Sequence, residues 1–494
     1  MSIVLQQSSP TLIVRANLIF VFLMMASLSC PVQAQENQAP APSSNDSSAD
    51  LKEQVRELRT LVEQLQKQVS DLQARVPTTQ PSERSGDRPA AQAPAPAQLA
   101  QEQPQARGDS SPNLATSDSR KGSNLLYGTT VNLLLDGYYE YNFNDPIGRA
   151  NLLRAYDVSS NAFSLNQAAL VVENAPDPSH GKRYGARLDL QFGQASEAVQ
   201  GNAVNEPRPD VYRNIFQAYG SYVIPVGHGL SVDFGKWASS LGIEGNYTKD
   251  QMNYSRSYWF NFLPFYHMGV RAQYQVNDEL AVNYWVVNGT NQTEPYNGFK
   301  DELFGVVVTP RKSITWTSNY YLGQEHPDFQ YEPVGTPGLP TQQGIPFEPI
   351  PNPAKGKLNI IDNYVAWNAS SKLTLAFEGD YIIERLRTSS PPDHTDGGAA
   401  YIRYQILPKV ALAARSEYMS DHGGLFSGTT QALKETTLTF EYRFTDNFMM
   451  REEWRRDSSN QPFFLTDTLG ILRKQQTTAG IGLVWWFGVK QGAW

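Results

Sequence analysis

The 494-residue chain contains a single cysteine, Cys30, inside a segment with the pattern of a cleaved leader. The mature chain would then have no thiol, which excludes disulfides, cysteine-based metal sites and a thiol nucleophile. Charged residues make up only 18% of the chain, and the formal net charge is -8 without any basic cluster. This balance argues against a nucleic-acid partner, because nucleic acids are bound by basic surfaces.

Long apolar runs are also scarce. The first candidate, residues 18–28, is shorter than the roughly 20 residues that a membrane-spanning helix requires. It follows Arg15 and is followed by small residues at 32–34, so we expect residues 1–34 to be a signal peptide. An N-terminal anchor and a lipoprotein modified at Cys30 are the weaker alternatives. Beyond residue 34 no apolar stretch is long enough to span a bilayer as a helix.

Patterns typical of catalysis are missing as well. The six histidines show no His-x-x-x-His spacing, and the chain has neither a nucleophile elbow nor a phosphate-binding glycine loop. The Asp/His groupings at 393–396 and 421–422 could be assembled into a dyad or a calcium site, but polar loop composition explains them better. We therefore expect no enzyme activity, no cofactor and no metal.

A regular heptad pattern is the first positive feature. Residues 35–50 are rich in Pro, Ser and Asn and should be disordered, and residues 77–124 read as a low-complexity linker. Between them, residues 51–76 alternate apolar spacings of four and three, which predicts a coiled coil. Its predicted core consists of Leu51, Val55, Leu58, Val62, Leu65, Val69, Leu72 and Val76.

The heptads leave the number of strands in the coiled coil open. Valine at a and leucine at d favour two parallel helices, whereas a trimer is common among channels of the class considered below. The helix could also pack on its own protein. A length of about 39 Å, at ~1.5 Å per residue, would make it a short stalk. We expect it to drive homo-oligomer formation or to reach toward peptidoglycan.

Alternating apolar and polar residues dominate the chain from residue 125 to its end. Sixteen candidate strands lie between Tyr127 and Phe487, among them residues 186–192, 270–276, 437–444 and 479–487. A soluble β-sandwich would show the same alternation, so the connections between strands decide the fold class.

These connections alternate between short and long. Short ones fall near residues 225–228, 277–278, 310–312, 368–371, 407–408 and 445–446. Long ones fall near residues 144–162, 194–210, 238–257, 289–301, 323–356, 386–397, 420–431 and 457–473. Short turns at one end and long loops at the other are typical of a transmembrane barrel. The pattern predicts an all-β antiparallel transmembrane barrel of about sixteen strands over residues 125–494, preceded by the coiled coil.

Aromatic residues cluster where these strands should meet the membrane surface. Tyr138, Tyr139 and Tyr141, residues 258–260 and residues 485–487 are expected to form the girdles that such barrels place at both interfaces.

Several short motifs occur along this region: DGYY at 136–139, NAFSLNQA at 161–168, DFGKW at 233–237, LGIE at 241–244 and NYSRS at 253–257. Through these motifs, residues 125–487 resemble the β-barrel porin-2 (OmpL-like) family. The resemblance implies a porin-like barrel in the outer membrane of a Gram-negative bacterium, in contact with outer-membrane lipid. The coiled coil is extra to the shared region.

If the apolar side of each strand faces lipid, the opposite side lines the lumen. The expected pore-lining charged residues are Arg187, Asp189, Arg271, Glu378, Asp380, Arg403, Arg415, Glu417, Glu441, Arg443, Arg451, Glu453 and Arg455. With Asp233 included, seven residues of each sign balance. They could brace the wall by cross-strand ion pairs or form a selectivity ladder.

We therefore expect a channel for passive diffusion of small hydrophilic solutes or ions. A structural tether with a plugged barrel, linked to the periplasm through the coiled coil, is the alternative. Residues 323–356 contain eight prolines and are the expected segment to narrow or cap the pore.

Overall fold

The computed structural model describes residues 128–200, 206, 208–333, 347–490 and 494. The chain divides into two units, Met1–Ala90 and Ala91–Trp494, and all described residues belong to the second. The predicted signal peptide, the disordered segment at 35–50, the coiled coil and the linker up to residue 124 lie outside the described residues. They remain predictions.

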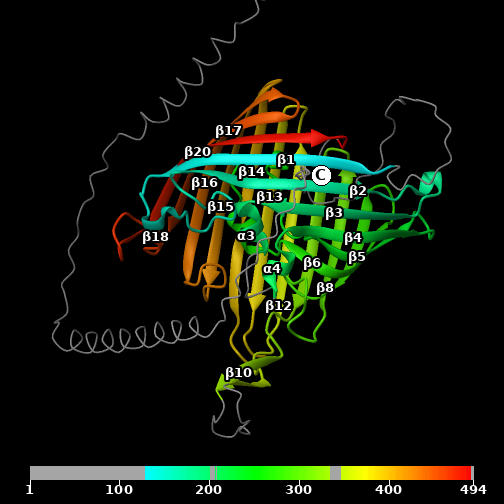
Figure 1. Ribbon diagram of the computed structural model, residues 1–494, viewed down its shortest axis with the longest axis horizontal. Coiled ribbons are helices and arrows are strands. Elements are labelled where there is room, and N and C mark those ends of the chain that lie inside the picture. Colours follow the sequence, from blue (N-terminus) through cyan, green and yellow to red (C-terminus); the bar gives the residue numbers. More distant parts are fainter. Residues whose placement is uncertain (1–127, 201–205, 207, 334–346, 491–493) are drawn as a thin grey trace, which may run out of the picture. The chain divides into compact units, whose positions relative to one another are not determined.

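The second unit is built around a closed antiparallel barrel of sixteen strands, which confirms the predicted fold and strand number (Figure 1). The first eight strands are β1 (Thr130–Asn142), β2 (Ala162–Asn174), β3 (Tyr184–Phe192), β4 (Ile215–Ile224), β5 (Leu230–Ala238), β6 (Tyr266–Gln275), β7 (Leu280–Val287) and β8 (Asp301–Arg311). The others are β9 (Ile314–Gly323), β12 (Leu358–Asn368), β13 (Leu373–Glu384), β14 (Asp393–Leu407), β15 (Val410–His422), β16 (Gln431–Thr445), β17 (Phe448–Ser459) and β20 (Gln475–Gly488).

Each barrel strand pairs with its neighbours along the chain, and β20 closes the ring by pairing with β1, for example Leu135 with Trp485. A bilayer offers no water to hydrogen-bond an open sheet edge, so closure satisfies every strand's backbone groups. This requirement explains why a chain with alternating strands and no disulfide can be stable in a membrane.

The two faces of the wall differ in polarity. Along β15, Leu412 and Tyr418 are 40% and 43% exposed on the outside, whereas Arg415 and Glu417 are buried on the inside. The same alternation recurs in β16, where Leu438 is exposed and Thr437 and Thr439 are buried. Apolar side chains thus face outward and polar ones inward, as a lipid-embedded barrel requires.

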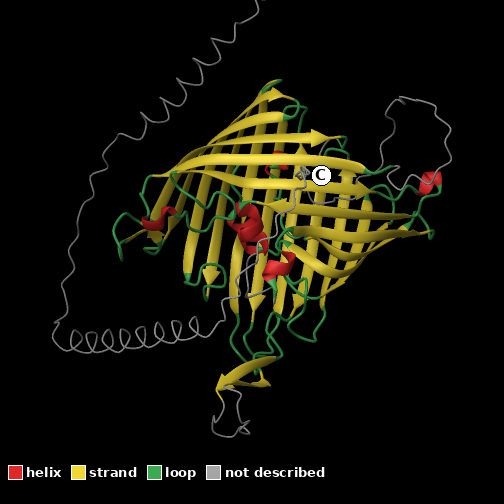
Figure 2. Cartoon of the chain, in the orientation of Figure 1, coloured by secondary structure: helices red, strands yellow, loops and turns green. Residues whose placement is uncertain are grey.

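Short turns join the strands at one end of the barrel and long loops at the other (Figure 2). The long loops carry the short helices α3 (Gln194–Gln200), α4 (Pro209–Tyr212) and α5 (Tyr258–Phe262), the 3-10 turns η1 (Ile147–Arg149) and η3 (Thr248–Asp250), and the hairpins β10 (Phe329–Pro333) with β11 (Phe347–Pro351) and β18 (Phe464–Leu465) with β19 (Leu472–Arg473). The turn η2 (Pro178–His180) lies between β2 and β3. In the part of the chain that the structure describes, no helix is long and apolar enough to cross a bilayer.

Aromatic side chains cover the outer wall near the short turns. Phe448 stacks between Phe444 and Trp485, with ring centroids 4.6 and 4.5 Å apart. The expectation for residues 258–260 is wrong, because these aromatics form α5 and are buried inside the barrel. It is also wrong for Tyr138, which is buried on the inner face and packs against Tyr254. An aromatic run between two strands has the same composition whether the loop stays at the interface or folds inward.

Candidate functional site

The connection between β5 and β6, residues 239–265, folds into the barrel, and we term it the inward loop. Thr248 Oγ1 donates to Asp136 of β1 at 2.7 Å, and the Gly242 amide donates to Asp362 of β12 at 3.1 Å. The Tyr258 amide donates to Glu417 of β15 at 2.8 Å. Contacts on such widely separated strands mean that the inward loop crosses the lumen.

Three buried arginines of the wall hold the loop by its backbone carbonyls. Arg415 donates to the carbonyls of Ser255 and Arg256 at 2.9 and 3.2 Å. Arg451 donates to the carbonyl of Gln251 at 2.5 Å, and Arg455 donates to that of Arg256, also at 2.5 Å. A buried irregular backbone needs partners for its carbonyls, and guanidinium groups with five donors each can supply several of them at once.

Wall carboxylates satisfy the loop's amides in the complementary way. Glu453 accepts from the amides of Tyr254 and Ser255 at 2.6 and 2.9 Å. The loop's own Glu244 accepts from the Ser257 amide at 2.6 Å and pairs with Arg415 at 2.8 Å. The opposite charges that the sequence places on the inner wall therefore act together on one segment.

Local sequence also favours this loop conformation. Ser257 caps α5 by accepting from the Phe260 amide at 2.9 Å, and the helix buries Tyr258 and Trp259 in the apolar core. Arg256 is folded back within the loop, where it donates to the carbonyls of Gly245 and Tyr254 at 3.0 and 2.8 Å. The loop is thus anchored both by packing and by charge-assisted hydrogen bonds.

An open vestibule of about 1080 Å³ leads from the short-turn end of the barrel to the inward loop. The turns at 225–229, 277–279 and 310–312 contribute lining residues at its mouth, and Ser239 and Ser240 of the inward loop line it at the inner end. The space between solvent and the loop is therefore wide on this side. The inward loop forms the inner end of this space.

A second polar group on the inner wall is predominantly cationic. Glu441 accepts from Arg403 at 2.7 Å, from Arg443 at 3.0 Å and from Arg451 at 2.8 Å. Three guanidinium groups around one carboxylate leave an excess of positive charge. The Arg443 side chain is 37% exposed, so part of this charge faces the lumen.

The structure places all thirteen residues that we expected to line the pore on the inner side of the wall. Seven of them hydrogen-bond to the inward loop: Asp189, Glu378, Arg415, Glu417, Arg451, Glu453 and Arg455. The other six are Arg187, Arg271, Asp380, Arg403, Glu441 and Arg443. Sequence reasoning found the face but not this role in anchoring a loop.

The described part of residues 323–356, the segment expected to narrow or cap the pore, does not enter the lumen. The described ends of residues 323–356 form the β10–β11 hairpin, which projects beyond the strand ends and away from the lumen (Figure 1). The inward loop is the segment that crosses the lumen. In the sequence, only the length of the inward loop sets it apart, whereas residues 323–356 stand out by their eight prolines.

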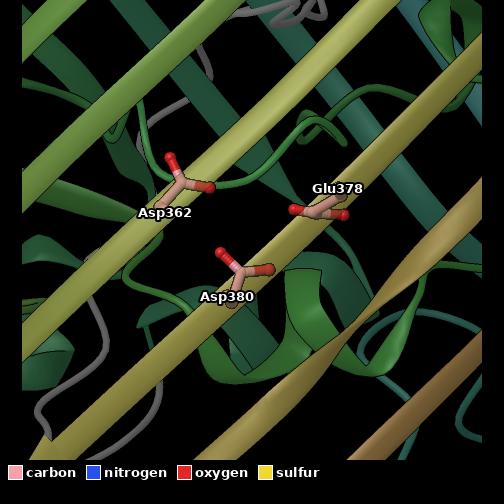
Figure 3. A group of neighbouring side chains, drawn as sticks. All are labelled: Asp362, Glu378 and Asp380. Carbon is pink, nitrogen blue, oxygen red and sulfur yellow. The ribbon is translucent and has the colours of Figure 1, made fainter.

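Three carboxylates that could hold a cation lie together on the inner wall. Asp362 of β12 stands opposite Asp380 of β13, and Glu378 is two residues before Asp380. One oxygen from each lies within 4.8 Å of the others, and the side chains point toward one another (Figure 3). We refer to Asp362, Glu378 and Asp380 as the carboxylate triad.

Comparison with known proteins agrees with this architecture. The family model described as "Putative beta-barrel porin-2, OmpL-like" matches residues 128–487. No curated protein matches the chain.

Several solved outer-membrane proteins are similar to this chain at low identity. A loop L8 deletion mutant of OmpT from Vibrio cholerae is 11% identical with a TM-score of 0.45, over 73% of this chain and 100% of that chain. An anion-selective porin from Comamonas acidovorans is 9% identical with a TM-score of 0.46, over 73% of this chain and 99% of that chain. The channel DcaP of Acinetobacter baumannii is 9% identical with a TM-score of 0.46, over 73% and 97%.

The match to the family model begins before β1 and extends to residue 487, one residue short of the end of β20. Family and fold together indicate a channel rather than an enzyme or a structural tether. The chain is a porin-like outer-membrane β-barrel and belongs to the "Putative beta-barrel porin-2, OmpL-like" family.

Proposed function

We propose that the protein lets small hydrophilic solutes or ions diffuse passively across the outer membrane, with the inward loop setting the size limit. The observation that carries this proposal is a vestibule of about 1080 Å³ that ends at a loop anchored across the lumen. A sixteen-stranded barrel is wide enough for an aqueous channel unless a segment folds inward. The chemistry is size exclusion combined with wall charge, without bond making or breaking.

Liposome swelling tests this proposal directly. Liposomes containing the folded mature chain should swell in isotonic solutions of small sugars, at rates that fall steeply as the sugar becomes larger. Liposomes with heat-denatured protein provide the control. Equal, negligible swelling in both preparations, with folding verified for the first, would leave the plugged-barrel alternative as the better account.

We propose that residues 51–76 form a periplasmic stalk through which copies of the chain associate. The support is the heptad core, together with the position of the barrel ends: β1 begins and β20 ends on the short-turn side. In transmembrane barrels short turns are periplasmic, so the segment before β1 would emerge there. Binding of the stalk to peptidoglycan would add a tethering function.

A double substitution in the full mature chain tests the stalk. Leu58→Asp with Leu65→Asp puts charges at two core positions and should lower the oligomer mass measured by light scattering in detergent. Exchanging Glu57 and Glu63 for Gln, outside the predicted core, is the control. An unchanged mass in the Asp variant would show that association, if present, is carried by the barrel.

A further inference from the structure

The carboxylate triad is buried in the part of the barrel where β12 and β13 meet the inward loop. The exposed fractions of Asp362, Glu378 and Asp380 are 0%, 6% and 5%. Asp362 and Asp380 are directly opposite in the strand register. Like charges in this position repel each other, so the arrangement is costly unless something neutralises it.

Several buried carboxylates of the wall have an arginine partner, and others, such as Asp136 and Asp421, accept hydrogen bonds from neutral donors on both oxygens. Arg271 binds Asp233 at 2.7 Å, and Arg154 binds Asp457 at 2.9 Å. Within residues 128–200, 208–333 and 347–490, by contrast, no lysine, arginine or histidine pairs with any member of the carboxylate triad. The triad is therefore a concentration of negative charge for which the described chain supplies no cation.

Neutral donors orient two of the three carboxylates. Asp362 accepts from the Gly242 amide at 3.1 Å and from Asn319 Nδ2 at 2.7 Å. Glu378 accepts from the Ile243 amide at 2.9 Å and from the Tyr401 hydroxyl at 3.1 Å. Each of these oxygens keeps a second lone pair, as in metal sites whose ligands are held in place by a surrounding shell of hydrogen bonds.

Asp380 supplies the independent indication of a ligand. Both of its carboxylate oxygens are buried, and neither has a hydrogen-bond partner among the described residues. A buried carboxylate without donors loses its hydration and gains nothing in return. A proton on Asp380, shared with the facing Asp362, is the competing way to neutralise the triad, and the experiment below distinguishes it from a bound cation.

We propose that the carboxylate triad binds a divalent cation of the hard, oxygen-preferring class, with Ca²⁺ as the best fit. Ca²⁺ takes 6–8 oxygen ligands in flexible geometry, whereas Mg²⁺ demands near-ideal octahedral coordination. The triad offers up to six carboxylate oxygens on two strands of a rigid wall. Its ligands also hold the amides of Gly242 and Ile243, so the cation fixes the start of the inward loop to β12 and β13.

Terbium luminescence on the full mature chain, folded in detergent and treated with EDTA, tests the proposal. Tb³⁺ replaces Ca²⁺ in oxygen-rich sites, and the Tyr401 hydroxyl lies 3.1 Å from Glu378, close enough to sensitise its emission. We expect saturable Tb³⁺ emission that added Ca²⁺ displaces and Mg²⁺ displaces poorly. Ca²⁺ should also raise the melting temperature of the EDTA-treated protein.

Asp380→Asn keeps the side-chain shape and removes one charge. It should weaken Tb³⁺ binding by at least about tenfold, the scale expected for disturbing a metal site, and Glu378→Gln should do the same. Asp233→Asn is the matched control, because it removes a buried wall carboxylate that already has an arginine partner. The control should bind Tb³⁺ like the wild type.

Two results would overturn the proposal. One is a folded wild-type protein that shows neither sensitised emission nor a Ca²⁺-dependent melting temperature, which would mean that protons neutralise the triad. The other is wild-type affinity in both Asp380→Asn and Glu378→Gln, which would place the bound ion elsewhere. Solute passage is a separate readout, so its failure would not be confused with failure of cation binding.

Discussion

Arg415 links the inward loop to the barrel wall through ion pairs and hydrogen bonds. Its guanidinium pairs with Glu244 of the loop at 2.8 Å and with Glu435 of β16 at 3.3 Å, and it donates to the carbonyl of Ser255. Arg415→Met keeps much of the side-chain volume but removes the charge. We expect the variant to loosen the inward loop and to enlarge the channel.

The magnitude follows from burial. Removing one partner of a buried ion pair costs about 3–5 kcal/mol, since the remaining charge is left without compensation. In the variant, Arg455 still lies 3.5 Å from Glu435. The carboxylates left without their cation are therefore mainly Glu244 and Glu417, which is 3.7 Å from Arg415 in the wild type. At ~1.4 kcal/mol per factor of ten, the population with a detached loop should rise by roughly 100-fold or more.

Single-channel recording and hydrogen exchange provide the assay. Arg415→Met should show larger and noisier conductance steps than wild type, with faster amide exchange in residues 239–265. Arg154→Met is the control, because it removes an equally buried arginine from a different loop and should lower stability without enlarging the channel. A folded Arg415→Met protein with wild-type conductance and wild-type exchange would refute the argument.

Two further predictions concern the ends of loops. Gly242 has φ +82° and a Cβ there would lie 3.0 Å from Glu378 Oε1, so Gly242→Ala should lower the melting temperature by an amount equivalent to about 1–3 kcal/mol and weaken Ca²⁺ binding. Hydrogen bonds from Arg208 and then Tyr212 lower the pKa of Glu294, which links two external loops. A carboxylate whose pKa is lowered by folding stabilises the folded state at pH values above its ordinary pKa of about 4.3. This stabilisation is lost as the pH falls through the lower pKa of the folded state. The link should therefore be intact from pH 5 to 8, and Glu294→Gln should increase amide exchange at residues 208–212 at neutral pH; equal exchange in both proteins would contradict it.

Much of the barrel could be predicted because strand alternation and connection length are local properties of the sequence. Leu438, Phe440 and Tyr442 alternate with Thr437, Thr439 and Glu441, and the structure puts the first set outside and the second inside. Lipid on one side and polar groups on the other leave no freedom in this pattern, since shifting a strand by one residue would reverse both faces.

The path of the inward loop could not be predicted in this way. Its anchors join Tyr254 to Glu453 and Ser255 to Arg415, partners separated by more than 150 positions. Alternation assigns Glu453 and Arg415 to the inner wall but gives no information about which loop they meet. Composition was misleading too, because the aromatic run at 258–260 fits both an interfacial girdle and a buried helix.

The carboxylate triad could be predicted from the sequence only in part. Asp362 and the Glu378–Asp380 pair sit on strands joined by the short turn at 369–372, so their closeness on neighbouring strands could be expected. The register could not, because a hairpin symmetric about that turn would pair Asp362 with Gly379, one residue short of the observed Asp380. What the sequence lacked was any sign that no arginine of the wall would approach these three side chains.

The central claim is that the barrel contains a water-filled passage narrowed by the inward loop, and conductance of the mature chain in a planar bilayer tests it most directly. We expect stepwise, long-lived and ohmic openings in the wild-type protein, with larger steps in Arg415→Met. Persistent silence from both proteins, inserted and shown to be folded, would contradict the claim and identify the barrel as closed.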